Sequence, residues 1–339
     1  MDRYKLIFKR FGALRETWTS METPDMSPFL HYDYMKYIRE SVALFKPYFT
    51  RIACICPVAS EDILMILPLK LRMDFRSYSL LGDMQGCDIA DVLWKPEISE
   101  TEKREILRFF FRSFKAKVYL NRIPEQSLLR ETVPPERVSF SRDVEYVAVD
   151  IPEEYDTWYG TLVYSVRRNN KTHYNRMEKA GIRPRLIIYD GQNPMKDAVW
   201  DQIIALYIQR LVTKYGQGLK GFFGRAVTRI KYRYLKHDSR SLRSLSNSFH
   251  AVLMDGDSIM AFLSGLKTHD GKTIAVPRLA MDARYYKYSP GYALMNETIR
   301  YLSGQNEVKV LDMSRGDEQY KKDFGGRSYF IKDYVIEKA

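Results

Sequence analysis

The sequence predicts a mixed α/β (α+β) protein of two modules, each a mixed, mostly antiparallel sheet flanked by helices. The 339-residue chain is long enough for two domains, and a hydrophobic content of 45% is enough for two cores. Strand-like and helix-like patterns alternate along the chain. Asp255-Gly256-Asp257, between two apolar runs, is a strong hairpin signal.

The first half combines strand-like runs with amphipathic helical patterns. The strand-like runs are 4–9, 51–56, 63–69, 78–81 and 116–120, and the helical patterns are 32–45 and 100–114. This half lacks a glycine-rich turn at the start of a helix, so we expect no cofactor site in it.

The second half follows the order β-α-α-β-β-β-α-β-α-β. Its strands are expected at 185–189, 249–254, 259–266, 273–281, 308–312 and 328–336, and its longer helical regions at 197–215, 222–236 and from 290 onward. The boundary between the modules is expected around residues 150–152, which gives domains of 1–150 and 151–339.

One turn in the second half has the composition of a phosphate-binding site. Ser289 is a favourable helix N-cap, Pro290 suits the first helical position, and Gly291 lets a ligand approach the backbone. The turn follows the expected strand 273–281, and the free N–H groups and dipole of the next helix favour an anion. On these residues alone, an ordinary capped helix is the alternative.

The order of elements and this turn together resemble the GNAT acetyltransferase fold. In that family an (Arg/Gln)-x-x-Gly-x-(Gly/Ala) signature wraps the pyrophosphate of acyl-CoA. Gly291 and Ala293 match the motif, whereas Tyr288 stands where the family has Arg or Gln, so the resemblance implies that the neighbouring Lys287 supplies the positive charge. The resemblance implies that acetyl-CoA or another acyl-CoA is bound by Lys287, Tyr288, Ser289, Pro290, Gly291, Tyr292 and Ala293.

A second motif narrows the resemblance. Ser289-Pro290-Gly291, followed by Asp312-Met313-Ser314-Arg315-Gly316 and then Tyr320-Lys321, resembles the CelD/BcsL-type branch of the superfamily, which is named for cellulose biosynthesis. The segment 165–181 resembles the basic helix of that branch. The two-module plan is similar to the Fem aminoacyltransferases, so we expect tandem GNAT-like modules. The first would be degenerate and the second catalytic.

The resemblance also implies catalytic residues. Acyl transfer needs a held donor, a deprotonated acceptor and protonation of the leaving thiolate. In the GNAT fold the fourth and fifth strands splay around the pantetheine arm. Asp312, at the carboxyl end of the fifth strand, would orient or deprotonate the acceptor, and Tyr320 would protonate the thiolate. A cap role for Asp312 and a packing role for Tyr320 stay open. Lys321 either meets a phosphate or carboxylate or is solvated.

The net charge of +12 favours anionic partners. Much of the excess lies on the basic helix, with Arg167 and Arg168, and in the run 225–243. These charges fit a phosphorylated or lipid-linked acceptor, the CoA phosphates or a membrane surface, or RNA; a solvated basic face is the alternative. Arg167, Arg168 and Arg315 are the candidate substrate-binding residues.

Other sequence features limit the compartment and the chemistry. The N-terminus has no secretory h-region, and no apolar run is long enough to span a membrane. We therefore expect a cytoplasmic protein, either free or in peripheral contact with the inner face of the membrane. The three cysteines, Cys54, Cys56 and Cys87, fit a reducing compartment; Cys54 and Cys56 are expected in the core, and no metal site is expected. His173 and His250 are weaker candidates for a base.

The sequence therefore predicts an N-acyltransferase that moves an acetyl or other short acyl group from acyl-CoA to an amine. An amino sugar of a cell-envelope or exopolysaccharide precursor is the candidate acceptor, and it comes only from the resemblance. A Fem-type transferase that uses aminoacyl-tRNA is an alternative, and tRNA is a partner only in that case. A non-catalytic partner of a polysaccharide synthase is another.

Overall fold

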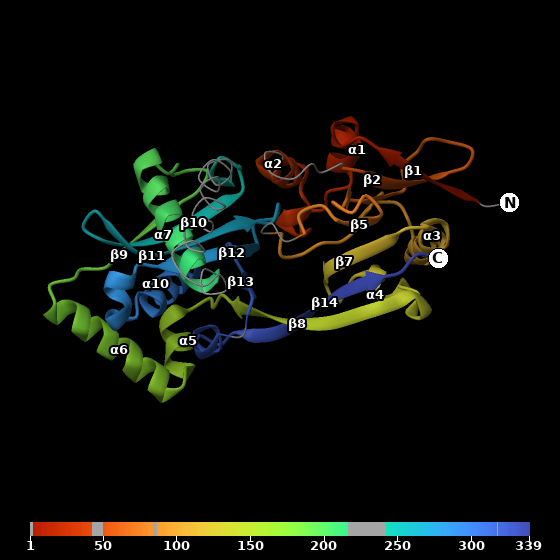
Figure 1. Ribbon diagram of the computed structural model, residues 1–339. Helices are drawn as coiled ribbons and strands as arrows, with labels where there is room; N and C mark the ends of the chain where they lie inside the picture. Colours follow the sequence, from red (N-terminus) through yellow and green to blue (C-terminus); the bar gives the residue numbers. More distant parts are fainter. Residues whose placement is uncertain (1–2, 43–49, 84–86, 216–241, 317) are drawn as a thin grey trace. The chain divides into compact units, whose positions relative to one another are not determined.

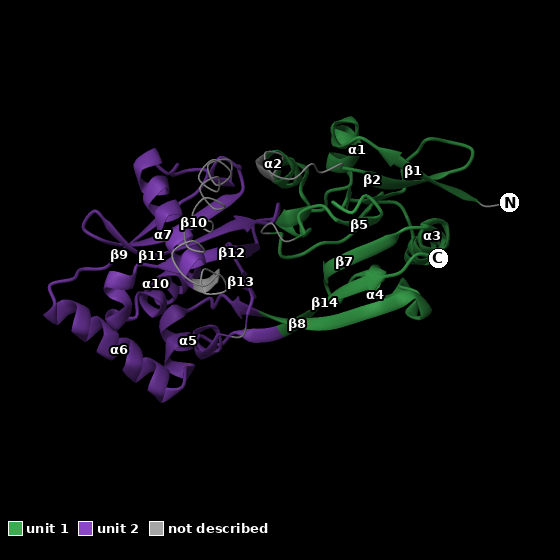
Figure 2. Cartoon of the chain, viewed as in Figure 1, with its two compact units in different colours: residues 1–146, 329–339 green, residues 147–328 purple. Residues whose placement is uncertain are grey.

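A computed structural model describes residues 3–42, 50–83, 87–215, 242–316 and 318–339. Contacts divide the chain into two compact units (Figure 2). Unit 1 comprises Met1–Tyr146 and Tyr329–Ala339, and unit 2 comprises Val147–Ser328. The expected division at 150 assigned the last residues of the chain to the second module, whereas here they group with the first.

Unit 1 contains two groups of strands. The first is ordered β1-β2-β3-β6 and is antiparallel, and the second includes β4-β5-β7-β14. The strands are β1 (Tyr4–Lys9), β2 (Ile52–Pro57), β3 (Met65–Leu67), β4 (Leu69–Leu71), β5 (Ser77–Leu80), β6 (Leu93–Trp94), β7 (Lys117–Ile123) and β14 (Arg327–Ile336). β8 (Val138–Asp150) and β14 both cross the unit boundary.

Short helices and two longer ones complete unit 1. They are η1 (Phe11–Leu14), α1 (Arg15–Ser20), η2 (Pro28–Leu30), α2 (Tyr32–Val42), α3 (Glu100–Ser113), α4 (Leu128–Thr132) and η3 (Pro135–Arg137). One apolar side of α3, including Ile106 and Phe110, packs against β1, β7 and their neighbours in a single core. The strand expected at 63–69 is two strands, because Pro68 cannot donate to a ladder, and β3 pairs with β2 while β4 pairs with β5.

Unit 2 has a sheet ordered β13-β12-β11-β10-β9 (Figure 1). Its strands are β9 (Arg185–Tyr189), β10 (Ser248–Asp255), β11 (Ser258–Lys267), β12 (Thr273–Met281) and β13 (Val310–Arg315). Its helices are α5 (Tyr155–Thr161), α6 (Tyr164–Lys179), α7 (Asp197–Tyr215), η5 (Ala283–Tyr288), α10 (Pro290–Gln305) and α11 (Gln319–Asp323). The helix expected at 222–236 lies outside the described residues.

The alternation of side chains along the strands of unit 2 separates two cores. Ala251 and Leu253 of β10 pack with α5, α6 and α10 on one face of the sheet. Val252 and Met254 pack with α7 on the opposite face. This is the α/β arrangement that the sequence predicts, with a mixed, mostly antiparallel sheet between helices.

The two units share one local pattern. In unit 1 the chain passes from β5 through α3 to β7, and β5 and β7 are parallel. In unit 2 it passes from β12 through α10 to β13, and these strands are also parallel. Each unit therefore contains a β-α-β crossover between parallel strands.

Candidate functional site

The candidate site begins at the turn from η5 into α10. Ser289 has φ +51° and ψ +56°, in the left-handed region, and its side chain makes no cap hydrogen bond. The sequence predicts a Ser289 side-chain cap, and that prediction is wrong, because such caps require an extended backbone at this position. Instead the Ser289 carbonyl accepts the Tyr292 N–H at 3.0 Å. Pro290 occupies the first turn as predicted.

Gly291 is packed tightly against the end of β12. A Cβ atom at this position would lie 2.7 Å from the Met281 Sδ atom. The space that glycine leaves is therefore filled by the thioether of Met281, whose side chain is flexible enough to move. The first turn of α10 also contains no acidic residue, so the positive end of its dipole is not neutralised by the helix itself.

A cavity of about 240 Å³ lies against this turn. Its wall is mainly apolar and comes from β12, η5, the start of α10 and α11. The lining residues are Leu279, Met281, Tyr286, Ser289, Pro290, Gly291, Tyr292 and Tyr320. Tyr320 therefore lines the same cavity as Gly291, although it follows Gly291 by almost thirty positions in the sequence. We call this cavity the turn pocket.

The strands beside the turn pocket separate where the family resemblance implies that they should. The parallel ladder joins Thr273 to Val310 and ends, within these fully described strands, at the rung of Ala275 and Asp312. Pro277, two residues further along β12, has no N–H to continue a ladder. Beyond this rung β12 runs on to Met281 and β13 to Arg315 without pairing with each other, although β12 stays paired with β11, so a wedge opens between β12 and β13.

Tyr320 is half-buried and lines the turn pocket. Burial, and then the nearby Glu318 carboxylate, raise its pKa above the ordinary value, and Arg210 opposes them. Its ring meets Tyr292 edge-on at 6.4 Å between centroids. Tyr292 donates a hydrogen bond to Asp323 at 2.6 Å, so its own hydroxyl is engaged. The phenol of Tyr320 stays protonated at neutral pH.

Asp312 lies inside β13 rather than at its carboxyl end, because the strand continues to Arg315. It does stand at the last rung before the strands separate. One carboxylate oxygen accepts the Ser314 N–H at 2.8 Å. Ser314 has φ +55°, and its buried hydroxyl finds no partner among the described residues. Asp312 therefore shapes the local backbone, which is the cap-like alternative, at the place where the wedge opens.

Lys321 is held by its own loop. It is 3% exposed, and its Nζ donates to the carbonyl oxygens of Arg315 and Gly316, each at 3.0 Å. The Glu318 carboxylate lies 2.9 Å from the same ammonium. These partners account for the donors of the ammonium, so Lys321 fixes the loop between β13 and α11. The Arg315 side chain is exposed beside it.

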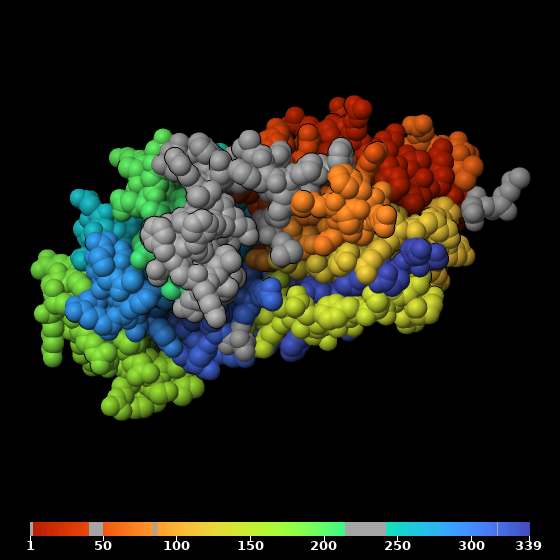
Figure 3. Space-filling view, viewed as in Figure 1, coloured from red at the N-terminus to blue at the C-terminus, as the bar shows by residue number. Residues whose placement is uncertain are grey.

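The basic residues at the start of α6 differ in their surroundings. Arg168 is exposed, whereas Arg167 is half-buried and its Nε finds no partner among the described residues. In the space-filling view the yellow-green side chains of α6 lie on the surface of unit 2 (Figure 3). Neither arginine lines the turn pocket. The second basic run, 225–243, lies almost wholly outside the described residues.

The two histidine candidates are in different environments. His173, on α6, lies with its ring 5.7 Å from that of Tyr292, and burial followed by the charge of Arg176 lowers its pKa. His250 is fully buried against Trp200, and burial lowers its pKa to about 3. His250 is thus neutral at any physiological pH and is enclosed in the core, so it does not suit a base.

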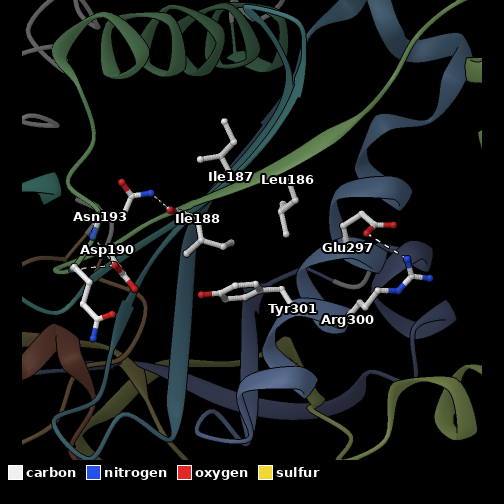
Figure 4. A pocket seen from close by; sticks show the side chains of 9 residues that line it. Leu186, Ile187, Ile188, Asp190, Asn193, Glu297, Arg300 and Tyr301 are labelled. Carbon is white, nitrogen blue, oxygen red and sulfur yellow. Dashed lines mark hydrogen bonds and ion pairs between the residues drawn. The ribbon is translucent and has the colours of Figure 1, made fainter.

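A larger cavity, of about 690 Å³, lies between β9 and α10 and contains none of the expected site residues (Figure 4). Leu186 and Ile188 line it from β9, and Glu297, Arg300 and Tyr301 line it from α10; Tyr301 points toward Ile188, whereas Glu297 and Arg300 point toward each other. Glu297 accepts a hydrogen bond from Tyr174 and pairs with Arg300 at 3.5 Å. The Glu297 carboxylate is therefore already engaged by two partners within the fold.

Sequence reasoning did not identify several residues that shape the site. Met281, Leu279 and Tyr286 line the turn pocket, and only their position at the end of a strand or beside the motif could have indicated them. The unpartnered hydroxyl of Ser314 depends on a left-handed backbone that no pattern predicts. No group of three or more His, Cys, Asp or Glu suited to a metal occurs in the described part of the chain. None of its helices is long and apolar enough to cross a membrane.

Comparison with known proteins agrees with this geometry. Residues 165–322 match the family model described as acetyltransferase (GNAT) domain. No curated protein matches the chain.

Solved structures of low sequence identity share the fold over nearly the whole chain. The C-terminal domain (DUF2156) of a putative lysylphosphatidylglycerol synthetase from Agrobacterium fabrum has a TM-score of 0.58 at 12% identity, covering 96% of this chain and 92% of that one. A conserved protein of unknown function from Bacteroides thetaiotaomicron has a TM-score of 0.55 at 14% identity, covering 98% and 100%. A GNAT-family acetyltransferase from Colwellia psychrerythraea has a TM-score of 0.51 at 6% identity, covering 98% and 100%. Residues 165–322, just under half of the chain, therefore match a GNAT acetyltransferase domain, and the chain is a transferase.

Proposed function

We propose that unit 2 binds an acyl-CoA at the turn pocket and transfers its acyl group to an amine. The observation that carries the proposal is the meeting of three features in one cavity: the small-residue helix start, the end of β12 beside the wedge, and the Tyr320 hydroxyl. In the proposed complex the pyrophosphate lies at the start of α10 and the pantetheine arm enters the wedge. The amide groups of pantetheine then pair with the facing edges of β12 and β13, which do not pair with each other there.

The reaction is a direct displacement at the thioester. The amine attacks the carbonyl carbon, and the tetrahedral intermediate expels the CoA thiolate. The raised pKa of Tyr320 lies above the roughly 8.5 of an ordinary thiol, so complete proton transfer from the phenol to free thiolate is uphill. Tyr320 therefore acts as a hydrogen-bond donor to the departing sulfur. The amine loses one proton as it is acylated, and that proton neutralises the CoA thiolate to give the free thiol.

Asp312 is proposed to orient the attacking amine or take its proton. The carboxylate stands at the point where β12 and β13 separate, which is where the thioester would lie. Lys321 acts indirectly in this proposal, because it holds the Arg315–Gly316 carbonyls that close the adjacent loop. Arg315, Arg167 and Arg168 are proposed to bind the anionic part of the acceptor from the surface.

The acceptor class rests on the resemblance to the CelD/BcsL-type branch. An amino sugar on a cell-envelope or exopolysaccharide precursor is the proposed acceptor, and it would place the protein in the cytoplasm near the inner face of the membrane. Transfer from aminoacyl-tRNA to an amine would need the same wedge but no acyl-CoA. A non-catalytic partner of a polysaccharide synthase would keep the fold without donor affinity.

Mass spectrometry of the small molecules retained by the purified protein, with calorimetry against acetyl-CoA, separates these cases. Acyl-CoA in the retained fraction and saturable acetyl-CoA binding are expected. Copurifying tRNA with no affinity for acetyl-CoA would favour the Fem-type donor. Absence of affinity for either donor would leave the non-catalytic role.

A further inference from the structure

A second cavity lies on the other side of the turn. It has a volume of about 400 Å³ and is lined by Arg176, Lys179 and Ala180 at the end of α6 and by Lys287 and Tyr288 of η5. Tyr286 and Ser289, which flank Lys287 and Tyr288 in sequence, line the turn pocket instead. The segment 286–289 is therefore a wall with one cavity on each side. We call the second cavity the basic pocket.

The basic pocket is lined by three exposed cations and, among the described residues, by no acidic side chain. None of Arg176, Lys179 and Lys287 forms an ion pair with any residue that the structure describes. The Lys287 Nζ lies 4.9 Å from the ring centroid of Tyr288, a contact that positions the ammonium but leaves its charge in place. Like charges brought into one hollow repel one another, and a multivalent anion relieves that repulsion.

The macrodipole of α6 explains part of this arrangement. Arg176 and Lys179 lie in the last turn of α6, where cations complement the negative end of the helix. That account does not cover Lys287, which comes from a different element and faces the same hollow. Three cations from two elements, beside a wall shared with the proposed donor site, fit a phosphate that belongs to the donor.

We propose that the basic pocket binds a phosphate monoester of the donor, the 3′-phosphate of coenzyme A, while the start of α10 binds the pyrophosphate. This inference rests on the proposed function and adds to it a requirement on the donor. A phosphate monoester carries close to two negative charges at neutral pH, and dephospho-CoA lacks only that group. The protein thereby distinguishes the two cofactor forms at a place remote from the thioester.

The test measures the affinities of CoA and dephospho-CoA by calorimetry for three forms of the full chain. These are the wild type, Arg176→Ala/Lys179→Ala, and the control Arg183→Ala/Arg185→Ala, which removes two exposed cations of unit 2 outside both cavities. We expect the wild type and the control to prefer CoA by on the order of 10-fold, the value of one charge-assisted contact. The basic-pocket variant should bind both ligands with the wild-type affinity for dephospho-CoA.

Two results would overturn the inference while leaving the proposed function standing. One is a wild type that binds both forms equally well. The other is a preference for CoA that survives in Arg176→Ala/Lys179→Ala, or that falls equally in the control. A wild type that binds neither form would instead refute the donor site itself. Thermal melts of each variant check that lost dipole interactions at the end of α6 have not unfolded the protein.

Discussion

Tyr320 owes its proposed role to burial, which keeps its phenol protonated, and to its place at the turn pocket. We expect Tyr320→Phe to lower the single-turnover rate by about 10²-fold with little change in CoA affinity, because one hydrogen-bond donor to the departing sulfur is lost. The control is Tyr301→Phe, on α10 but outside the turn pocket. Because burial raises the pKa of the Tyr320 phenol, the phenol keeps its proton up to at least about pH 10. We therefore expect no decrease of the wild-type rate from deprotonation of Tyr320 below that pH. Equal rates for both variants would assign Tyr320 to packing.

Asp312 tests the acceptor side of the same reaction. Asp312→Asn keeps an oxygen that can accept the Ser314 N–H, so the backbone of β13 should be preserved. We expect turnover to fall on the order of 10²-fold while acetyl-CoA affinity stays nearly constant. Asp257→Asn, in the exposed hairpin turn, is the control. A lower melting temperature with an unchanged single-turnover rate would instead show that Asp312 only caps its strand.

The residues of the site were only partly predictable from the sequence. The motif identified Gly291 and Tyr320, which the structure brings to one cavity. It did not identify Lys321 as a loop-holding residue, because burial of an ammonium depends on carbonyl groups that become neighbours only in the folded loop. Nor did it separate Arg176 and Lys179 from the other cations of α6, since the hollow they line includes η5.

Two helices that occupy equivalent positions in the β-α-β crossovers begin in opposite ways. In α3, Ser99 accepts the Glu102 N–H at 3.3 Å, and Glu100 and Glu102 neutralise the positive end of the dipole. In α10 no side chain caps the first turn, and no acid lies in it. The helix start in unit 1 is therefore unfavourable for an anion, whereas the first turn of α10 leaves the positive end of its dipole without acidic side chains.

The start of α10 yields a test of the donor site. We expect Gly291→Val to abolish acyl-CoA binding, because the added side chain must push Met281 into the turn pocket. Gly304→Val is the matched control, since a Cβ atom there meets nothing within 4 Å and lies in the same helix. Calorimetry measures both, and melting curves show whether each variant is folded. Wild-type affinity in Gly291→Val would move the donor site elsewhere.

Strands and long helices were the most predictable elements. The predicted bounds of β1 and β12 agree with the structure because apolar runs between turn residues define them. β8 was not predicted, although it is long, because its first part is exposed and lacks a regular apolar alternation. The extension of β13 to Arg315 was missed for a similar reason, since its last residues have no ladder partner in β12 to impose a pattern.

At the scale of the whole chain, two units with related crossovers carry one candidate donor site. We expect acetyl-CoA to bind with a stoichiometry of one per chain, because only the crossover of unit 2 presents a helix start free of acidic residues. Calorimetric titration of the wild type measures this directly. Two sites per chain, or one site that persists when Gly291→Val has removed the first, would contradict it.

Strand β14 makes the stability of unit 1 depend on residues near the end of this sequence. Lys332 to Ile336 pair with β7, and Ile331 and Ile336 are fully buried. We expect Ile336→Ala to destabilise the protein by about 2–5 kcal/mol through the cavity it leaves. Phe330→Ala, on the same strand but 47% exposed, should cost much less. Denaturant unfolding of the two variants compares them, and similar losses would argue against a core role for β14.

The pairing of β14 with β7 also has a consequence for biosynthesis. About two hundred residues, including nearly all of unit 2, are translated between these two strands. At ordinary elongation speeds the ribosome needs roughly 10–40 s to make that stretch. During this interval the nascent first unit carries the edge of β7 without its final neighbour, so chaperones that shield exposed strands have a defined period in which to act. Most of unit 1 is therefore synthesised before unit 2 but is completed after it.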